Sequence, residues 1–251
     1  STKLHTLKKL SDLVLTIQSL TYRDRMSASL IVILAETGMR VEELTLLERN
    51  KLKEIKLSDD RKASYLEFKV FKNKMRYEGG FVKSVCYASE TCAFAYGALE
   101  KLAYRAINDL STIRYKKRLL GVRGIKFPWA TKTSEIEDAL SKFTQIDIQQ
   151  MNEECHRYLY VNLLNGQSGF KDATFMFRQS LKKFFFRNRD ILNLDKLDQK
   201  DLSKLKNKIL LNNENDKFIL RAEKQNLEKF IGTKLYYASP HQFRVTVCTK
   251  L

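Results

Sequence analysis

Residues 22–47 read YRDRMSASLIVILAETGMRVEELTLL, and they predict two successive helices. Its apolar residues recur at helical spacing, at Met26, Leu30, Ile33 and Leu34. Gly38 ends the pattern, since glycine readily takes the left-handed conformation that closes a helix. A second short apolar pattern over residues 41–47 predicts another helix. Arg40 therefore lies in a turn between two packed helices, and we expect its side chain to be rigidly placed.

A small β-sheet is expected after this helical stretch. Residues 64–71 alternate in part between aromatic and charged side chains, which is typical of a strand with one buried face. Gly79 and Gly80 then precede the β-prone residues 81–87. The pattern predicts a β-hairpin or a small three-stranded antiparallel sheet.

The rest of the chain is predicted to be helical. Helical periodicity runs through residues 91–120 and again through residues 134–232, with a loop at Pro128 and Trp129 between them. Breaks are expected around residues 165–169 and 212–215. We therefore expect a mainly α fold with a small antiparallel β-sheet.

The composition points to an anionic partner. The 251 residues include 46 Lys and Arg against 29 Asp and Glu, which gives a formal net charge of +17. Such a surface attracts polyanions, and nucleic acid is the first candidate. An anionic membrane is the rival, but the longest uncharged apolar stretch, residues 26–35, is far shorter than the roughly 20 residues that a spanning helix needs. We expect no membrane-spanning segment.

The cysteines argue against a metal centre. Cys86, Cys92, Cys155 and Cys248 form no CxxC pair and lack the compact His and Cys spacing of zinc sites. Reduced thiols in a cytoplasmic protein are therefore expected, with no metal and no other cofactor.

Two separated motifs carry the chemistry. Residues 37–44 read TGMRVEEL, and residues 240–246 read PHQFRVT. Together with the lysine-bearing hairpin between them, they resemble the active-site boxes of the tyrosine recombinase (phage integrase) family of DNA strand-exchange enzymes. The order of the three elements along the chain also matches. The resemblance covers the catalytic domain of that family without its C-terminal tail, and it implies the catalytic-domain fold for residues 1–251.

The resemblance implies catalytic roles for four side chains. Arg40 and Arg244 would stabilise the charge that develops on a phosphodiester, because guanidinium groups make paired, charge-assisted hydrogen bonds to phosphate oxygens. His241 would assist as an acid or base, and Lys72 of the hairpin would protonate the leaving 5′ hydroxyl. Lys74 is the alternative to Lys72. The reaction would be transesterification through a 3′-phosphotyrosyl intermediate, without metal or nucleotide.

The setting implied by the resemblance is the integration or excision of a mobile element. The partner would be double-stranded DNA, with the full-length protein assembling as a tetramer on it. A relative that keeps the fold and binds DNA without catalysis is the alternative. A third interpretation, a helical adaptor for acidic proteins, would leave the two ordered motifs as a coincidence.

The sequence also departs from the family. The interval between Arg40 and His241 is longer than usual, so we expect an enlarged helical insertion over residues 130–232. The family's nucleophilic tyrosine follows the second motif, and the sequence given ends at Leu251. We therefore expect this polypeptide not to complete cleavage, since Tyr236 and Tyr237 precede the motif.

Two further basic segments allow alternative interpretations. The cluster around Tyr115 could track DNA phosphates or form a solvated helix face; its basic members include Arg114, Lys116, Lys117 and Arg118. The phenylalanines of residues 175–186 alternate with basic residues, as in surfaces that stack bases. We favour core packing for them, because a helical period would bury many of the rings together.

Overall fold

The computed structural model describes residues 21–58, 62–70, 82–125, 127–128, 130–160, 170–192, 207–210, 212–221, 223, 227–232 and 234–243. The chain divides into two compact units. Unit 1 comprises Ser1–Val41 and Phe175–Leu251, and unit 2 comprises Glu42–Thr174. Described residues from the two ends of the sequence, 21–41 and 234–243, thus belong to one unit. The insertion predicted over residues 130–232 includes the last part of unit 2 and much of unit 1.

Unit 1 is built on two long helices. Helix α2 spans Tyr22–Thr37 and helix α8 spans Phe170–Arg187, with the residues of α8 from Phe175 onward in this unit. Thr21 caps α2, where its side chain accepts a hydrogen bond from the Asp24 amide (3.3 Å). Five consecutive residues of α2, 30–34, are at most 1% exposed. The middle of this helix is therefore buried on all sides, whereas Arg23 and Arg25 near its start are exposed.

A small two-stranded sheet completes unit 1. Strand β4 (Asn207–Leu210) pairs antiparallel with β5 (Lys234–Tyr237), and α10 (Glu214–Leu220) and the 3-10 helix η2 (Leu227–Phe230) lie between them in sequence. Buried side chains of β4, α10 and β5 pack against α8 in one apolar cluster. It consists of Phe186, Ile209, Leu220 and Leu235. The helix predicted over residues 134–232 is therefore wrong at β4, because a short segment paired with a distant strand carries little local signal.

Unit 2 combines a three-stranded antiparallel sheet with helices. The strands β1 (Leu52–Lys56), β2 (Lys62–Val70) and β3 (Val82–Ala88) lie in the order β1-β2-β3. Helix α3 (Val41–Thr45) starts at the last residue of unit 1 and leads into unit 2. The prediction of a mainly helical protein with a small antiparallel sheet is confirmed.

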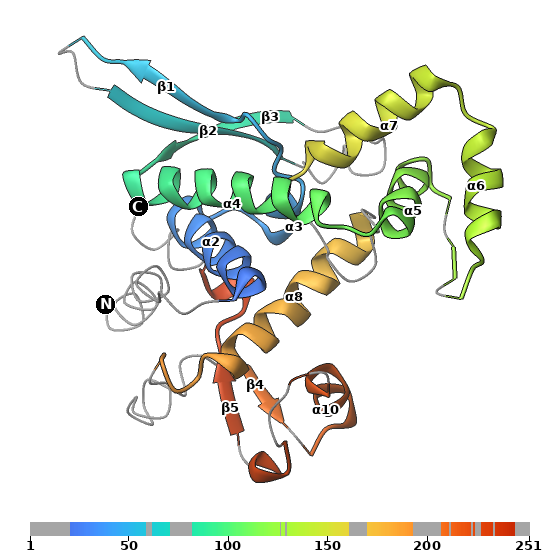
Figure 1. Cartoon of the computed structure of the whole chain (residues 1–251). Helices are drawn as coiled ribbons and strands as arrows, with labels where there is room; N and C mark the ends of the chain where they lie inside the picture. Colours follow the sequence, from blue (N-terminus) through green and yellow to red (C-terminus); the bar gives the residue numbers. More distant parts are fainter. Residues whose placement is uncertain are drawn as a thin grey trace. The chain divides into compact units, whose positions relative to one another are not determined.

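Four more helices complete unit 2: α4 (Glu90–Asn108), α5 (Thr112–Val122), α6 (Thr133–Ser141) and α7 (Gln145–Arg157). The sequence predicted one helical run over residues 91–120, and the structure interrupts it at residues 109–111. Helices α5, α6 and α7 share a separate apolar core, made of Leu119, Leu120, Ile136, Met151 and Cys155. The interruption after α4 lets α5 turn toward α6 and α7 (Figure 1).

None of the helices in the described part of the chain combines the length and the apolarity that crossing a bilayer requires.

Candidate functional site

The TGMR motif forms a turn fixed by its own hydrogen bonds. Gly38 closes α2 in the left-handed conformation (φ 66°), and its amide donates to the Leu34 carbonyl (3.0 Å). The Thr37 hydroxyl donates to the Ile33 carbonyl (2.6 Å) and accepts from the Met39 amide (3.3 Å). Met39 is itself 2% exposed. The backbone on the N-terminal side of Arg40 is therefore anchored.

Arg40 follows this anchored turn and directly precedes α3. Its side chain is half-buried. The sequence predicted a rigid placement between two helices, and α2 and α3 flank the residue as expected. A half-buried guanidinium on a fixed backbone is suited to binding an oxyanion, because little side-chain freedom is lost when the anion binds.

The described part of the second motif also forms an anchored turn. Residues 240–243 are helical, and the Ser239 carbonyl accepts from the amides of Gln242 (3.0 Å) and Phe243 (3.4 Å). The Gln242 side chain also bonds back to the start of the turn, where its Oε1 accepts a hydrogen bond from the Ser239 amide (2.9 Å). Phe243 is fully buried, and Pro240 and Gln242 are buried beside it. His241 is exposed.

The described residues bring two of the four predicted catalytic residues into one unit. Arg40 and His241 both belong to unit 1. Arg244, Lys72 and the alternative Lys74 lie outside the described residues. The sequence places Lys72 and Lys74 in the connection between β2 and β3, since β2 ends at residue 70 and β3 begins at residue 82.

The base of this β2–β3 connection is strongly basic. Lys69 and Lys83 are directly opposite each other on the two strands. Like charges at opposing positions normally destabilise a sheet. Here the Lys69 ammonium group hydrogen-bonds to a Glu48 carboxylate oxygen, whereas Lys83 is exposed and has no acidic partner among the described residues.

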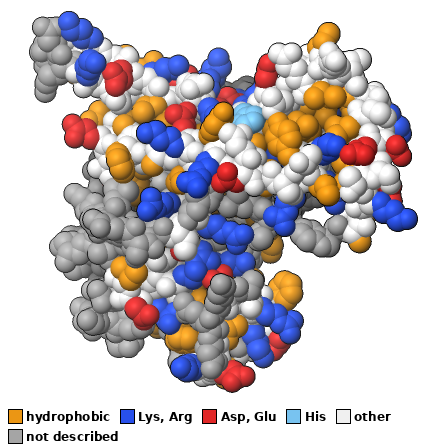
Figure 2. Space-filling view, in the orientation of Figure 1, with side chains coloured by type: hydrophobic (Ala, Val, Ile, Leu, Met, Phe, Trp, Pro, Cys, Tyr) orange, Lys and Arg blue, Asp and Glu red, His pale blue; other side chains and the backbone are white. Residues whose placement is uncertain are grey.

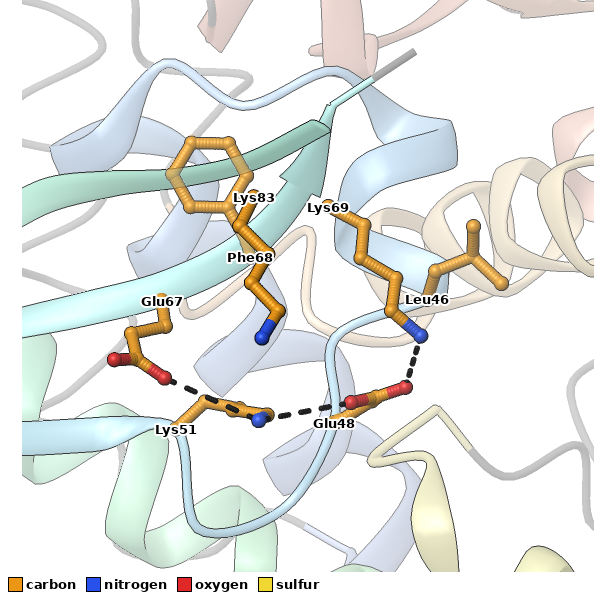
Figure 3. A pocket seen from close by; sticks show the side chains of 7 residues that line it. All are labelled: Leu46, Glu48, Lys51, Glu67, Phe68, Lys69 and Lys83. Carbon is orange, nitrogen blue, oxygen red and sulfur yellow. Dashed lines mark hydrogen bonds and ion pairs between the residues drawn. The ribbon is translucent and has the colours of Figure 1, made fainter. Parts of the chain in front are cut away.

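A small pocket of unit 2 lies against these lysines (Figure 3). Lys51 lies between Glu48 and Glu67, with its Nζ 3.9 Å from a carboxylate oxygen of each. The Lys83 ammonium group also points toward Lys51 in Figure 3. The pocket volume is about 40 Å³, which suits a few water molecules or one small group and excludes a nucleotide.

Lys51, Lys69 and Lys83 belong to no motif that is recognisable in the sequence. Lys69 belongs to the alternating pattern that predicted β2, so its face could be predicted in part. Its position opposite Lys83 depends on the strand register, which the connecting segment does not reveal.

The predicted basic cluster on α5 separates into surface and interior residues. Lys116 pairs with Glu137 of α6 (Nζ–Oε1 2.8 Å), and Lys117 Nζ donates to the Pro128 carbonyl (3.2 Å). Arg114 is exposed. Arg118, by contrast, is 1% exposed and donates from Nη2 to the Cys155 carbonyl (3.1 Å). The predicted DNA contact is therefore wrong for Arg118, because its guanidinium group is buried inside unit 2.

Basic side chains also occur widely elsewhere. Figure 2 shows Lys and Arg over much of the drawn face, with acidic side chains scattered between them. Core packing, the favoured prediction for the phenylalanines of α8, is confirmed for four of them. Phe177, Phe184, Phe185 and Phe186 are at most 1% exposed. Phe175 is 60% exposed and differs from this group.

The two tyrosines next to the second motif have structural contacts. Tyr237 lies on β5, where the Lys182 ammonium is 5.8 Å from its ring centre, and burial raises the pKa of its hydroxyl. Lys208 Nζ lies 5.3 Å from the ring centre of Tyr236. A raised pKa makes Tyr237 a poorer nucleophile, since less of it is ionised at neutral pH.

The described residues contain no group of three or more His, Cys, Asp or Glu side chains that could hold a metal ion. Cys86, Cys92 and Cys155 are thiols outside any disulfide, and Cys248 lies outside the described residues. Burial raises the pKa of Cys86 to about 11, so this thiol stays protonated at neutral pH.

Comparison with known proteins gives no match: no protein-family model, no curated protein and no solved structure is significantly similar to this chain.

Proposed function

We propose that this chain binds duplex DNA and directs Arg40 and His241 at one phosphodiester, as the catalytic region of a tyrosine-recombinase-like enzyme. One observation carries the proposal. Residues 37–40 of the first motif and residues 240–243 of the second lie far apart in the sequence, yet both form anchored turns in the same compact unit. An exposed imidazole and a half-buried guanidinium on fixed backbones are the group types that phosphodiester chemistry needs.

The proposed reaction is a transesterification. A tyrosine oxygen attacks phosphorus, the bond from phosphorus to the 5′ oxygen breaks, and the phosphate remains joined to the 3′ oxygen and the tyrosine. Arg40 and Arg244 stabilise the charge on the nonbridging oxygens. His241 acts as acid or base, and Lys72 gives its proton to the 5′ oxygen. Integration or excision of a mobile element, by a tetramer on DNA, is the setting that the resemblance implies.

Unit 2 supports the DNA-binding part of this proposal on its own. At the base of the β2–β3 connection, Lys83 is exposed and lacks an acidic partner among the described residues, whereas Lys69 opposite it is paired with Glu48. A lysine pair of this kind is less unfavourable when an anionic backbone lies over it. The net charge of +17 adds a general attraction to polyanions.

The second candidate function is DNA binding without catalysis. It is favoured by the contacts of Tyr236 and Tyr237, which serve the packing of unit 1 around β5. In this case Arg40 and His241 would act only as phosphate contacts, which position a protein on DNA without reading its sequence.

The first experiment measures binding of the 251-residue chain to a labelled duplex by fluorescence anisotropy. We expect the logarithm of the affinity to fall linearly with the logarithm of the salt concentration between about 50 and 200 mM, because bound lysines and arginines release counterions. Lys83→Ala should weaken binding and reduce the slope by about 1. Absence of binding at low salt, or a flat salt dependence, would overturn both candidate functions.

The second experiment separates the two candidates. Hydrogen peroxide, with EDTA to suppress metal-driven oxidation, can replace the tyrosine as nucleophile at an activated phosphodiester. Strand cleavage by the wild-type chain that falls by at least about tenfold in Arg40→Ala supports the enzyme. Binding without any Arg40-dependent cleavage supports the inert relative.

A further inference from the structure

Unit 2 contains a cluster of buried polar atoms without hydrogen-bond partners. Five ring or guanidinium nitrogens are in this state: Nε and Nη2 of Arg49, Nε and Nη1 of Arg118, and Nδ1 of His156. Buried polar groups are nearly always hydrogen-bonded in native proteins. An unmet charged donor is the most costly kind. Five such atoms in one place indicate that a partner is missing.

The contacts of the three residues join them into one cluster. Arg118 Nη2 donates to the carbonyl of Cys155 (3.1 Å), the residue before His156. The Arg49 amide donates to the carbonyl of Arg157 (2.9 Å), the residue after it. Arg118 and Arg49 are therefore hydrogen-bonded to the residues on either side of His156.

Tyr104 of α4 closes the arrangement. Its ring centre lies 5.8 Å from that of His156 and 5.4 Å from the guanidinium carbon of Arg49. The cluster thus connects α4, α5, α7 and the segment between α3 and β1 within unit 2.

The positive charge of this cluster is only partly compensated by nearby acidic groups. Burial lowers the pKa of both Arg49 and Arg118, and each arginine also lowers the pKa of His156. The negative charge of Glu100 raises the pKa of Arg49, but Glu100 Oε1 already accepts a hydrogen bond from the Asn50 amide (2.7 Å). Arg118 donates to the backbone carbonyl of Cys155, which carries no net charge. The buried guanidinium of Arg118 and the half-buried guanidinium of Arg49 therefore lie close to each other and to a neutral imidazole.

We propose that Arg49, Arg118 and His156 form a binding site for a free tetrahedral oxyanion of phosphate or sulfate size. Such an ion offers several acceptor oxygens to the guanidinium nitrogens and neutralises their charge. The site is separate from the proposed DNA contacts, because its nitrogen atoms are buried and a polymer backbone does not reach them. The bound ion would fix α5 and α7 to the segment before β1.

The test compares thermal unfolding of the 251-residue chain in inorganic phosphate, sulfate and chloride at matched ionic strength. A ligand that binds only the folded state raises the Tm with its concentration. We expect each tenfold rise in phosphate above its Kd to raise the Tm by about 3–6 °C. No difference between phosphate, sulfate and chloride would overturn the proposal and leave trapped water as the partner of these atoms.

Variants locate the effect. Arg118→Met and Arg49→Met should lose most of the phosphate response. Arg123→Met is the matched control, since Arg123 follows α5, is exposed and donates to Gln150 (3.2 Å). It should keep the full response. A full response in Arg118→Met would contradict the site.

A measurement on the wild-type chain covers the case in which these variants fail to fold. Phosphate bound beside His156 should raise the pKa of its imidazole, as followed by NMR. An unchanged His156 pKa in saturating phosphate would also refute the site.

Discussion

Arg187, at the end of α8, donates from Nε to both carboxylate oxygens of Asp24 in the first turn of α2 (3.1 Å each). Its Nη1 also donates to Glu223 (2.8 Å). The Asp24 side chain is only 3% exposed. This contact joins the helix that ends in the TGMR turn to the helix that opens the second segment of unit 1. It therefore helps to hold the scaffold of both motifs together.

Breaking this contact should be costly. Arg187→Met leaves the Asp24 carboxylate buried without its partner, and removing one member of a buried ion pair typically costs about 3–5 kcal/mol. We expect a loss of this size in the free energy of unfolding, measured by urea denaturation. Lys217→Met is the control in the same unit, because Lys217 and Glu214 are exposed (Nζ–Oε1 3.7 Å) and should contribute at most about 0.5 kcal/mol. Equal losses in the two variants would contradict the role of Arg187.

Tyr96 should be important for unit 2. Its buried hydroxyl donates to the Glu48 carbonyl (2.7 Å) and accepts from the Lys51 amide (2.9 Å), so it holds the backbone of two pocket residues. Tyr96→Phe leaves both groups unpaired and should cost about 1–3 kcal/mol in urea denaturation. Tyr87→Phe, at a side chain that is 71% exposed, should change stability very little. Similar stability of Tyr96→Phe and the wild type would show that water replaces the hydroxyl.

Acid should lower the free energy of unfolding through the protonation of His156. Burial, followed by repulsion from Arg49 and Arg118, lowers the pKa of His156 below its ordinary value of 6.5. The unfolded chain therefore takes up a proton near this value while the folded chain does not. The contribution of His156 is complete above about pH 6.5 and declines as the pH falls toward the lower folded pKa.

Urea denaturation in phosphate-free chloride buffer checks this expectation. Between about pH 7.5 and pH 5, the wild type should lose more stability than His156→Asn, whose side chain does not titrate in this range. Parallel losses in the two proteins would contradict a depressed pKa at His156.

Local patterns predicted the helical parts of the chain well. The apolar run before Gly38 gave α2 with its end at the correct place, since helical period and a glycine cap are encoded within a few residues. The partial alternation before residue 71 likewise predicted β2. Both signals depend on neighbours in the sequence.

Features that depend on distant partners were missed or misjudged. Strand β4 was predicted as helix because its pairing with β5 lies far along the chain. Arg118 was assigned to the surface because a basic helix usually faces solvent, yet Cys155 of α7 supplies its carbonyl partner inside unit 2. The burial of a charged residue is decided by the elements packed around it, which periodicity alone does not identify.

A double-mutant cycle on DNA affinity shows whether Arg40 and His241 act on one DNA phosphate. Binding of duplex DNA is measured for the wild type, Arg40→Ala, His241→Ala and the double variant, with Lys229→Ala replacing Arg40→Ala in a control cycle. Lys229 is an exposed basic residue of η2 in the same unit. Side chains that share a ligand group show coupling of about 0.5–3 kcal/mol, and independent sites add within about 0.5 kcal/mol. We predict coupling above about 0.5 kcal/mol for Arg40 with His241 and additivity for Lys229 with His241; additive effects of Arg40 and His241 would contradict the shared phosphate site.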